Sequence, residues 1–167
     1  WRAMSQTTLG TTRSAMRNRF SLESRRFIPA SPDRVFAAWT DPLELEKWWG
    51  PANVRCISAE IDLRIGGHYR IGNELPDKTV VWIEGVFERI ERPSLLVYTW
   101  QTDPESTARE KVTVRMNPQG HGTEVIVRHE RIASQALRDQ HGEGWNGCLD
   151  GLYTYLGVFD GPRPLGR

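Results

Sequence analysis

The chain has 167 residues, a size expected for one domain, and its 38% hydrophobic content excludes a wholly disordered protein. Its formal charge is +1, but the first nineteen residues carry four arginines and no acid, which leaves 18 Lys and Arg against 21 Asp and Glu from Phe20 onward. This larger part lacks the basic surplus of a nucleic-acid-binding surface. No run of 18 apolar residues is present to cross a membrane.

Two cysteines, Cys56 and Cys148, stand far apart and match no CxxC or metal-ligand spacing. A disulfide-stabilised secreted domain would carry more cysteines, so the composition favours a reduced, cytoplasmic setting. The four histidines are scattered and lack the spacing of a zinc site. We therefore expect neither a metal nor a cofactor.

Residues 1–19 are polar, rich in Ser, Thr and Arg, and lack the apolar segment of a secretory signal. This composition resembles an organelle transit peptide, but a flexible tail is the simpler interpretation. The chain begins with Trp, so Met4 or Met16 could be its natural start. We expect one domain over residues 20–160 and a second tail over residues 161–167.

The first predicted strand covers Phe20–Ile28, and two short helices follow it. The Ser-Pro-Asp motif at residues 31–33 combines an N-cap, a proline at the first helical position and an acid in the first turn. The Asp-Pro pair at residues 41–42 repeats this start signal. The Gly-Pro pair at residues 50–51 ends the second helix.

Six further β runs follow, separated by turn-forming Gly, Pro, Asn and Asp residues. They are Val54–Ile61, Gly67–Ile71, Thr79–Ile90, Leu95–Gln101, Arg109–Met116 and Thr123–Arg131. The connections between them are too short to hold a crossover helix, so they predict an antiparallel meander.

After Ser134 the apolar residues recur at helical spacing. One side of the predicted helix carries His141, Trp145, Leu149, Leu152 and Leu156. Several glycines also fall within this helix, and each costs roughly 1 kcal/mol relative to alanine in a helix interior. We expect them to admit a closely packed neighbour, most simply a strand.

The order of these elements resembles the helix-grip arrangement. The motifs that strengthen the match are Trp39-Thr40-Asp41-Pro42, Trp48-Trp49-Gly50-Pro51, Gly66-Gly67, and His141 with Gly144-Trp145, Leu149, Leu152, Tyr155 and Leu156. Together they resemble the family named for activators of the heat-shock protein 90 ATPase, within the START-like (SRPBCC) superfamily, over about residues 20–158. The resemblance implies an α+β helix-grip fold, in which a curved antiparallel sheet of six to seven strands and a long C-terminal helix enclose a hydrophobic cavity.

Three functional hypotheses follow, because the superfamily is functionally diverse. The first is a protein, monomeric or homodimeric, that binds a small apolar or amphipathic molecule in the cavity. The second is a module that binds a chaperone or another protein through an exposed apolar patch. The third is a cyclase-like or dehydratase-like enzyme, with His129 or His141 and a carboxylate transferring protons in the same cavity. No catalytic set can be carried over from the family onto this sequence.

The candidate cavity residues are large apolar side chains expected to face inward, with two histidines in phase with them. They are Trp39, Trp48, Trp82, Trp100, Val125, Val127, His129, His141, Trp145, Leu149 and Leu152. Glu84 and Glu88 share one face of a strand and are interpreted as a solvated surface, and Glu110 receives no role.

Overall fold

The structure is a computed structural model that describes residues 20–157. Its elements are β1 (Phe20–Ile28), α2 (Pro32–Thr40), α3 (Pro42–Trp48), β2 (Arg55–Ile61), β3 (His68–Glu74), β4 (Val80–Glu91), β5 (Leu95–Trp100), β6 (Glu110–Gln119), β7 (Gly122–Ile132) and α4 (Gln135–Gly157). The tails expected over residues 1–19 and 161–167 lie outside the described residues. Within residues 20–157 the order of elements is the predicted one.

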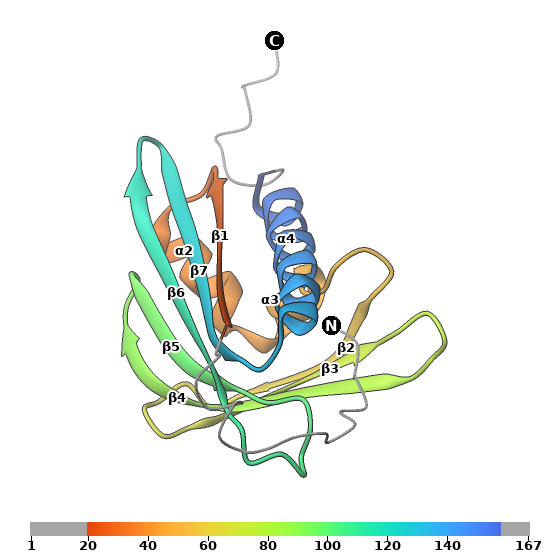
Figure 1. Cartoon of the computed structure of the whole chain (residues 1–167). Helices are drawn as coiled ribbons and strands as arrows, with labels where there is room; N and C mark the ends of the chain where they lie inside the picture. Colours follow the sequence, from red (N-terminus) through yellow and green to blue (C-terminus); the bar gives the residue numbers. More distant parts are fainter. Residues whose placement is uncertain (1–19, 158–167) are drawn as a thin grey trace.

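The seven strands form one antiparallel sheet in the order β1-β7-β6-β5-β4-β3-β2. From β2 to β7 each strand pairs with the next along the chain, which confirms the predicted meander. The first strand then pairs with the last. The sheet is curved, and α4 runs along its concave side (Figure 1). This is the helix-grip α+β architecture that the sequence predicts.

The two short helices begin where their capping residues predict. The Ser31 side chain accepts a hydrogen bond from the backbone N–H of Arg34 at 3.2 Å, and a proline occupies the first turn. Asp41 caps the second helix in the same way, accepting from the N–H of Leu43 at 2.9 Å. Each cap satisfies one of the N–H groups that a helix start leaves unpaired.

The glycines of α4 face a different neighbour from the expected strand. A Cβ on Gly147 would lie 2.5 Å from Cβ of Pro51, and one on Gly151 would lie 2.5 Å from the carbonyl oxygen of Trp48. Both distances are too short for non-bonded atoms. The missing side chains therefore let the end of α3 and the segment after it pack directly against α4.

Polar contacts fasten the C-terminal half of α4 to the rest of the domain. The Tyr155 hydroxyl donates to Glu44 in α3 at 2.8 Å, and Glu44 also pairs with Arg34 at 2.6 Å. The hydrogen bond from Arg34 lowers the pKa of the Glu44 carboxyl. Arg26 in β1 pairs with Asp150 on the same helix. Within residues 20–157, no helix combines the length and apolar character needed to cross a bilayer.

Candidate functional site

An apolar cavity lies between the short helices and the concave face of β2 to β5. The described residues that line it are Trp39, Leu45, Trp49, Ile61, Tyr69, Ile71, Phe87, Tyr98 and Trp100. The centre of a water-sized sphere can reach about 20 Å³ of this space, which is room for about one water molecule. The cavity is therefore narrow, and a larger guest would have to displace its walls.

Two predicted cavity residues, Trp39 and Trp100, line this space. Trp49 also lines it, although sequence reasoning left it out. The helix ends at Trp48, so the extended backbone at Trp49 turns its indole inward. Trp48 itself is buried and donates its indole N–H to the carbonyl of Ala38 at 2.9 Å. Its position fastens α3 to α2 and leaves it outside the cavity wall.

Trp82 lies on the opposite, outer face of the sheet. Side chains alternate along a strand, and its neighbour Ile83 is fully buried on the inner face. The guanidinium carbon of Arg70 lies 3.7 Å from the centre of the Trp82 ring. Trp82 therefore stands outside the cavity, contrary to the expectation. Its strand phase matches that of Glu84, which was already interpreted as surface.

The remaining apolar candidates form solid core between α4 and the sheet. They are Val125, Val127, Trp145, Leu149 and Leu152, all with no exposed surface, and none of them lines the cavity. Trp145 stacks on Trp39 with ring centres 6.1 Å apart, and its ring lies 5.5 Å from those of Trp49 and Trp100. Trp145 thus packs behind three of the residues that line the cavity.

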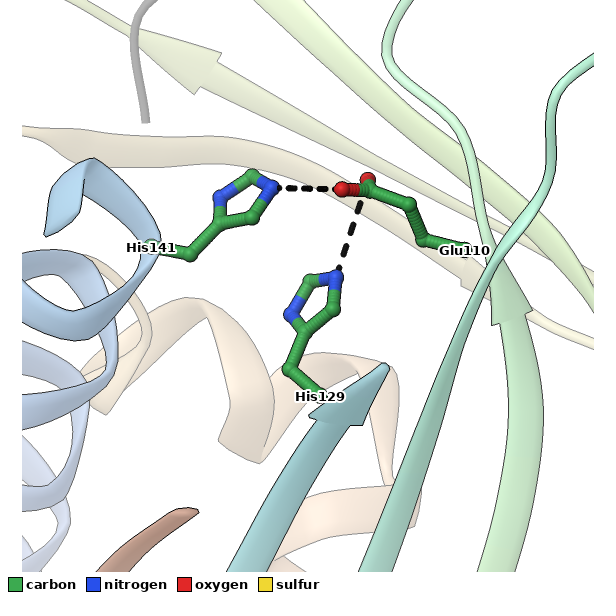
Figure 2. Close-up of side chains that lie close together, drawn as sticks. All are labelled: Glu110, His129 and His141. Carbon is green, nitrogen blue, oxygen red and sulfur yellow. Dashed lines mark hydrogen bonds and ion pairs between the residues drawn. The ribbon is translucent and has the colours of Figure 1, made fainter. Parts of the chain in front are cut away.

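Three ionisable side chains meet at the start of α4 (Figure 2). Glu110 begins β6, His129 lies near the end of β7, and His141 lies in the second turn of α4. His141 Nε2 lies 2.9 Å from Glu110 Oε1, a hydrogen-bond distance. His129 Nε2 lies 3.6 Å from Glu110 Oε2, a close electrostatic contact. The two imidazole rings stack with centres 4.4 Å apart. We call these three residues the Glu110 cluster.

Trp145 determines where His129 carries its proton. The indole Nε1 lies 3.0 Å from His129 Nδ1, and an indole N–H can only donate. His129 Nδ1 must therefore accept, so the neutral ring has its proton on Nε2 and directs it toward Glu110. A doubly protonated His129 would set two N–H groups against each other. The contact with Trp145 therefore favours the neutral ring.

The pKa values of the Glu110 cluster follow from burial and mutual contact. Burial lowers the pKa of His129, and the attraction of Glu110 offsets this only in part. Burial by itself would raise the pKa of Glu110, but its interactions with His129 and His141 outweigh this and hold the pKa below its ordinary value. The cluster therefore combines an ionised carboxylate with a neutral His129 at neutral pH.

The donor set of the Glu110 cluster has the composition of a metal site, since its nitrogen and oxygen atoms lie within 4.8 Å of one another. The second contact of His129 argues against one. A metal-binding histidine normally donates its other N–H to an acceptor. Here Trp145 donates to Nδ1, so the proton occupies the Nε2 atom that a metal would need. The arrangement fits hydrogen bonding to a carboxylate better than metal binding.

Sequence reasoning gave Glu110 no role, although strand alternation places it on the inward face of the sheet. Glu110 falls in phase with Val112 and Val114, which are both fully buried on the inner face of β6. His129 pairs across the sheet with Val112. An acid at an inward position of β6 and a histidine at an inward position of β7 therefore had to lie close together. Recognising this needs the strand pairing as well as the alternation.

The Glu110 cluster and the cavity share one wall. The ring of Trp100 lies 5.1 Å from that of His129 and also lines the cavity. On the other side, Glu110 and Trp100 border a small cleft with Gln101 and Ser106, where about 50 Å³ is open to the centre of a water-sized sphere. Neither histidine lines the cavity or this cleft. Glu110 is therefore the member of the cluster nearest to solvent.

The curved sheet, the gripping helix and the interior cavity define the class of helix-grip domains. A comparison with protein-family models also shows to which family within this class the chain belongs. The model of the family described as activator of Hsp90 ATPase homolog 1-like protein matches residues 29–157, so the chain belongs to that family. No curated protein sequence matches the chain.

Solved structures with the same fold come from several bacteria. An AHSA1-like protein from Aeromonas hydrophila is 21% identical, with a TM-score of 0.72 over 86% of this chain and 99% of its own. Protein CV1439 from Chromobacterium violaceum is 23% identical, with a TM-score of 0.73 over 81% and 96%. CalU16 from Micromonospora echinospora is 26% identical, with a TM-score of 0.64 over 81% and 75%. These similarities support the fold, and the function has to be inferred from the site.

Proposed function

We propose that the protein binds a small, largely apolar molecule in the interior cavity. The observation that carries this proposal is the apolar composition of the cavity lining. All nine described lining residues are aromatic or aliphatic, and they come from both short helices, the segment after them and four strands. Sites for small molecules are concave and mainly apolar, with few polar groups. An interior wall of this kind matches a hydrophobic guest.

The narrowness of the cavity sets a condition on binding. Because only about 20 Å³ is open to a water-sized sphere, the guest must push side chains aside as it enters. Ile61 is the half-buried member of the lining, and it lies at the end of β2, one of the two edge strands of the sheet. This edge of the sheet is therefore the part of the wall best able to move.

The positions of other residues favour this function over the two alternatives. Proton transfer in the cavity needs a group at its wall that titrates near neutral pH. His129 and His141 do not line the cavity, and burial raises the pKa of the two tyrosines that do, Tyr69 and Tyr98. A docking module needs a continuous apolar patch. Only five large hydrophobic side chains of the described residues are more than a third exposed, which is few for a docking surface: Phe27, Leu43, Ile57, Ile65 and Tyr153.

Two probes of similar shape test the proposal, 2-isopropylnaphthalene and 2-naphthamide. Binding is measured by calorimetry and by the change in tryptophan fluorescence, since three tryptophans line the cavity. Ile71→Phe fills the cavity, whereas Ile126→Phe makes the same change at a half-buried position whose neighbours in β7 face inward. We expect wild type and Ile126→Phe to bind the hydrocarbon probe and Ile71→Phe to lose it.

Two results would overturn the proposal. One is the absence of binding of either probe to folded wild-type protein. The other is undiminished binding to Ile71→Phe, which would place the probe elsewhere.

A further inference from the structure

One buried polar side chain makes no hydrogen bond with the described residues. Asn73 in β3 has no exposed surface, and neither its Nδ2 nor its Oδ1 has a hydrogen-bond partner. Burying an amide without partners costs free energy, so buried polar groups are nearly always paired with protein, water or ligand. Leucine would fill the same position without that cost. The amide at this position therefore indicates a partner that binds there.

The position of Asn73 along β3 points to what that partner is. Side chains on one face of a strand follow every second residue, about 6.6 to 6.8 Å apart. Ile71, the preceding residue on this face, lines the apolar cavity. Leu75, the following one, lines a separate and larger groove, and its backbone still pairs with that of Thr79. Asn73 therefore lies between the cavity and the groove, although it lines neither of them, so a ligand has to displace neighbouring side chains to reach it.

This groove runs between the first turns of α4, the segment after α3 and the turn that joins β3 to β4. Its described lining residues are Pro51, Ala52, Asn53, Val54, Leu75, Pro76, Gln140, Glu143 and Gly144. About 480 Å³ of it is open to the centre of a water-sized sphere. Gly144 is buried and has no side chain to obstruct the groove.

The groove holds a second polar atom without a partner. Gln140 Oε1 is buried and accepts no hydrogen bond from the described residues. Glu143 is the one charged residue among the described lining residues of the groove, and the cavity lining has none. A carboxylate ligand would meet this negative charge without a cation to offset it. A neutral ligand that both donates and accepts hydrogen bonds fits these groups better.

We propose that the groove is the entrance to the cavity and that Asn73 is the specificity-determining residue for a neutral amide. This inference rests on the proposed function. The ligand class is a molecule with an apolar ring body and a primary amide, lactam or imide at one end. The body occupies the aromatic cavity, and the amide pairs its N–H and C=O with the carboxamide of Asn73. Gln140 Oε1 accepts a hydrogen bond from a ligand N–H during entry.

Asn73→Leu tests the assignment because it keeps the size of the side chain and removes both polar atoms. The matched control is Asn117→Leu, the same change at an exposed position of β6. The free Asn73→Leu protein should be at least as stable as wild type, since an unpaired buried amide has been removed. Its affinity for 2-naphthamide should fall about tenfold or more, while its affinity for 2-isopropylnaphthalene stays within about threefold. Asn117→Leu should change neither.

Each other outcome contradicts a defined part of the inference. Equal loss of both probes, or a less stable Asn73→Leu protein with unchanged probe selectivity, would make Asn73 a structural residue. Asn73→Ala repeats the comparison if the leucine variant does not fold. If Asn73→Leu and Asn73→Ala bind 2-naphthamide as tightly as wild type, Asn73 does not recognise the amide, and the proposed function is unaffected. Failure of both probes to bind wild type would overturn the proposed function and this inference with it.

Discussion

The concave face of the sheet has two halves that differ in how tightly they are covered. Along β1, β7 and β6 the inward side chains, such as Ile28, Val114 and Val127, have no exposed surface and pack under α4 and α2. Along β2 to β5 several inward side chains border the cavity, and the unpaired Asn73 also lies in this part of the sheet. The first half is closely packed, whereas the second contains open space and a buried amide without a partner.

The two halves also treat buried polar groups differently. In the packed half, His141 and His129 each have one ring nitrogen at hydrogen-bond distance from a partner, Glu110 and Trp145 respectively, although His141 Nδ1 and His129 Nε2 make no hydrogen bond with the described residues. In the open half, Asn73 has no partner. A buried polar group with hydrogen-bond partners stabilises the packing of the helix on the sheet. A buried polar group without partners lowers the stability of the protein as long as no partner is bound. The contrast is that Asn73 has neither of its polar atoms paired, whereas each histidine has one ring nitrogen within hydrogen-bond distance of a partner.

The largest expected effect comes from the packed half. Trp145→Ala should lower the free energy of unfolding by about 3–5 kcal/mol, because Trp145 is fully buried against other rings and does not line the cavity. Denaturant unfolding measures the loss, and binding of 2-isopropylnaphthalene per folded molecule should change little. A small loss of stability with altered probe binding would instead make Trp145 a cavity wall.

A matched pair of deletions compares two positions within the open half, one at the cavity and one away from it. Ile71 and Ile83 lie opposite each other on β3 and β4, but only Ile71 lines the cavity. Ile83→Ala should cost about 2–5 kcal/mol. Ile71→Ala should cost less, since one side of Ile71 already lacks packing partners, and it should bind the hydrocarbon probe more tightly. Equal costs and equal affinities would remove the distinction between the two positions.

Acid should weaken the packed half first. The depressed pKa of His129 means that the folded protein resists a proton that the unfolded chain accepts, so stability falls as pH drops below about 6.5. The depressed pKa of Glu110 adds a further loss at lower pH, from about 4.5 downward. Each unit of depression corresponds to about 1.4 kcal/mol.

His129→Asn separates this titration from other acid effects. The Asn side chain oxygen can still accept from Trp145 but does not titrate in this range. The dependence of unfolding free energy on pH between 7 and 5 should therefore be shallower in the variant. An unchanged slope would show that groups outside the Glu110 cluster cause the acid sensitivity.

The smallest effect is expected on the outer face. Arg70 covers the Trp82 ring and donates to Glu84 at 2.7 Å, but both charged side chains are exposed. Arg70→Ala should cost about 0.5–1 kcal/mol, the range for an exposed cation–π contact. Probe binding should stay at the wild-type level. A change in probe affinity would mean that this strand pair transmits outer-face packing to the cavity.

The sequence by itself determined the elements and their order. Helix caps at Ser31 and Asp41 act within one turn, and strand alternation and short turns also depend on neighbouring residues. The motifs of the two short helices and the final helix were sufficient to indicate the family, which the family match confirms. Local signals of this kind need no knowledge of which strands pair.

The tertiary structure decided which residues form the site. Glu110 meets His129 and His141 only because β6 pairs with β7 and α4 crosses that end of the sheet. Trp145 looked like a cavity wall from its helical phase, but the three tryptophans around it separate it from the open space. Asn73 lies in strand phase with Ile71, but the predicted strand ended at Ile71, and strand phase does not show whether a buried amide has a partner. Contacts between distant segments depend on sheet curvature and register, and these are set by the packing of the whole domain.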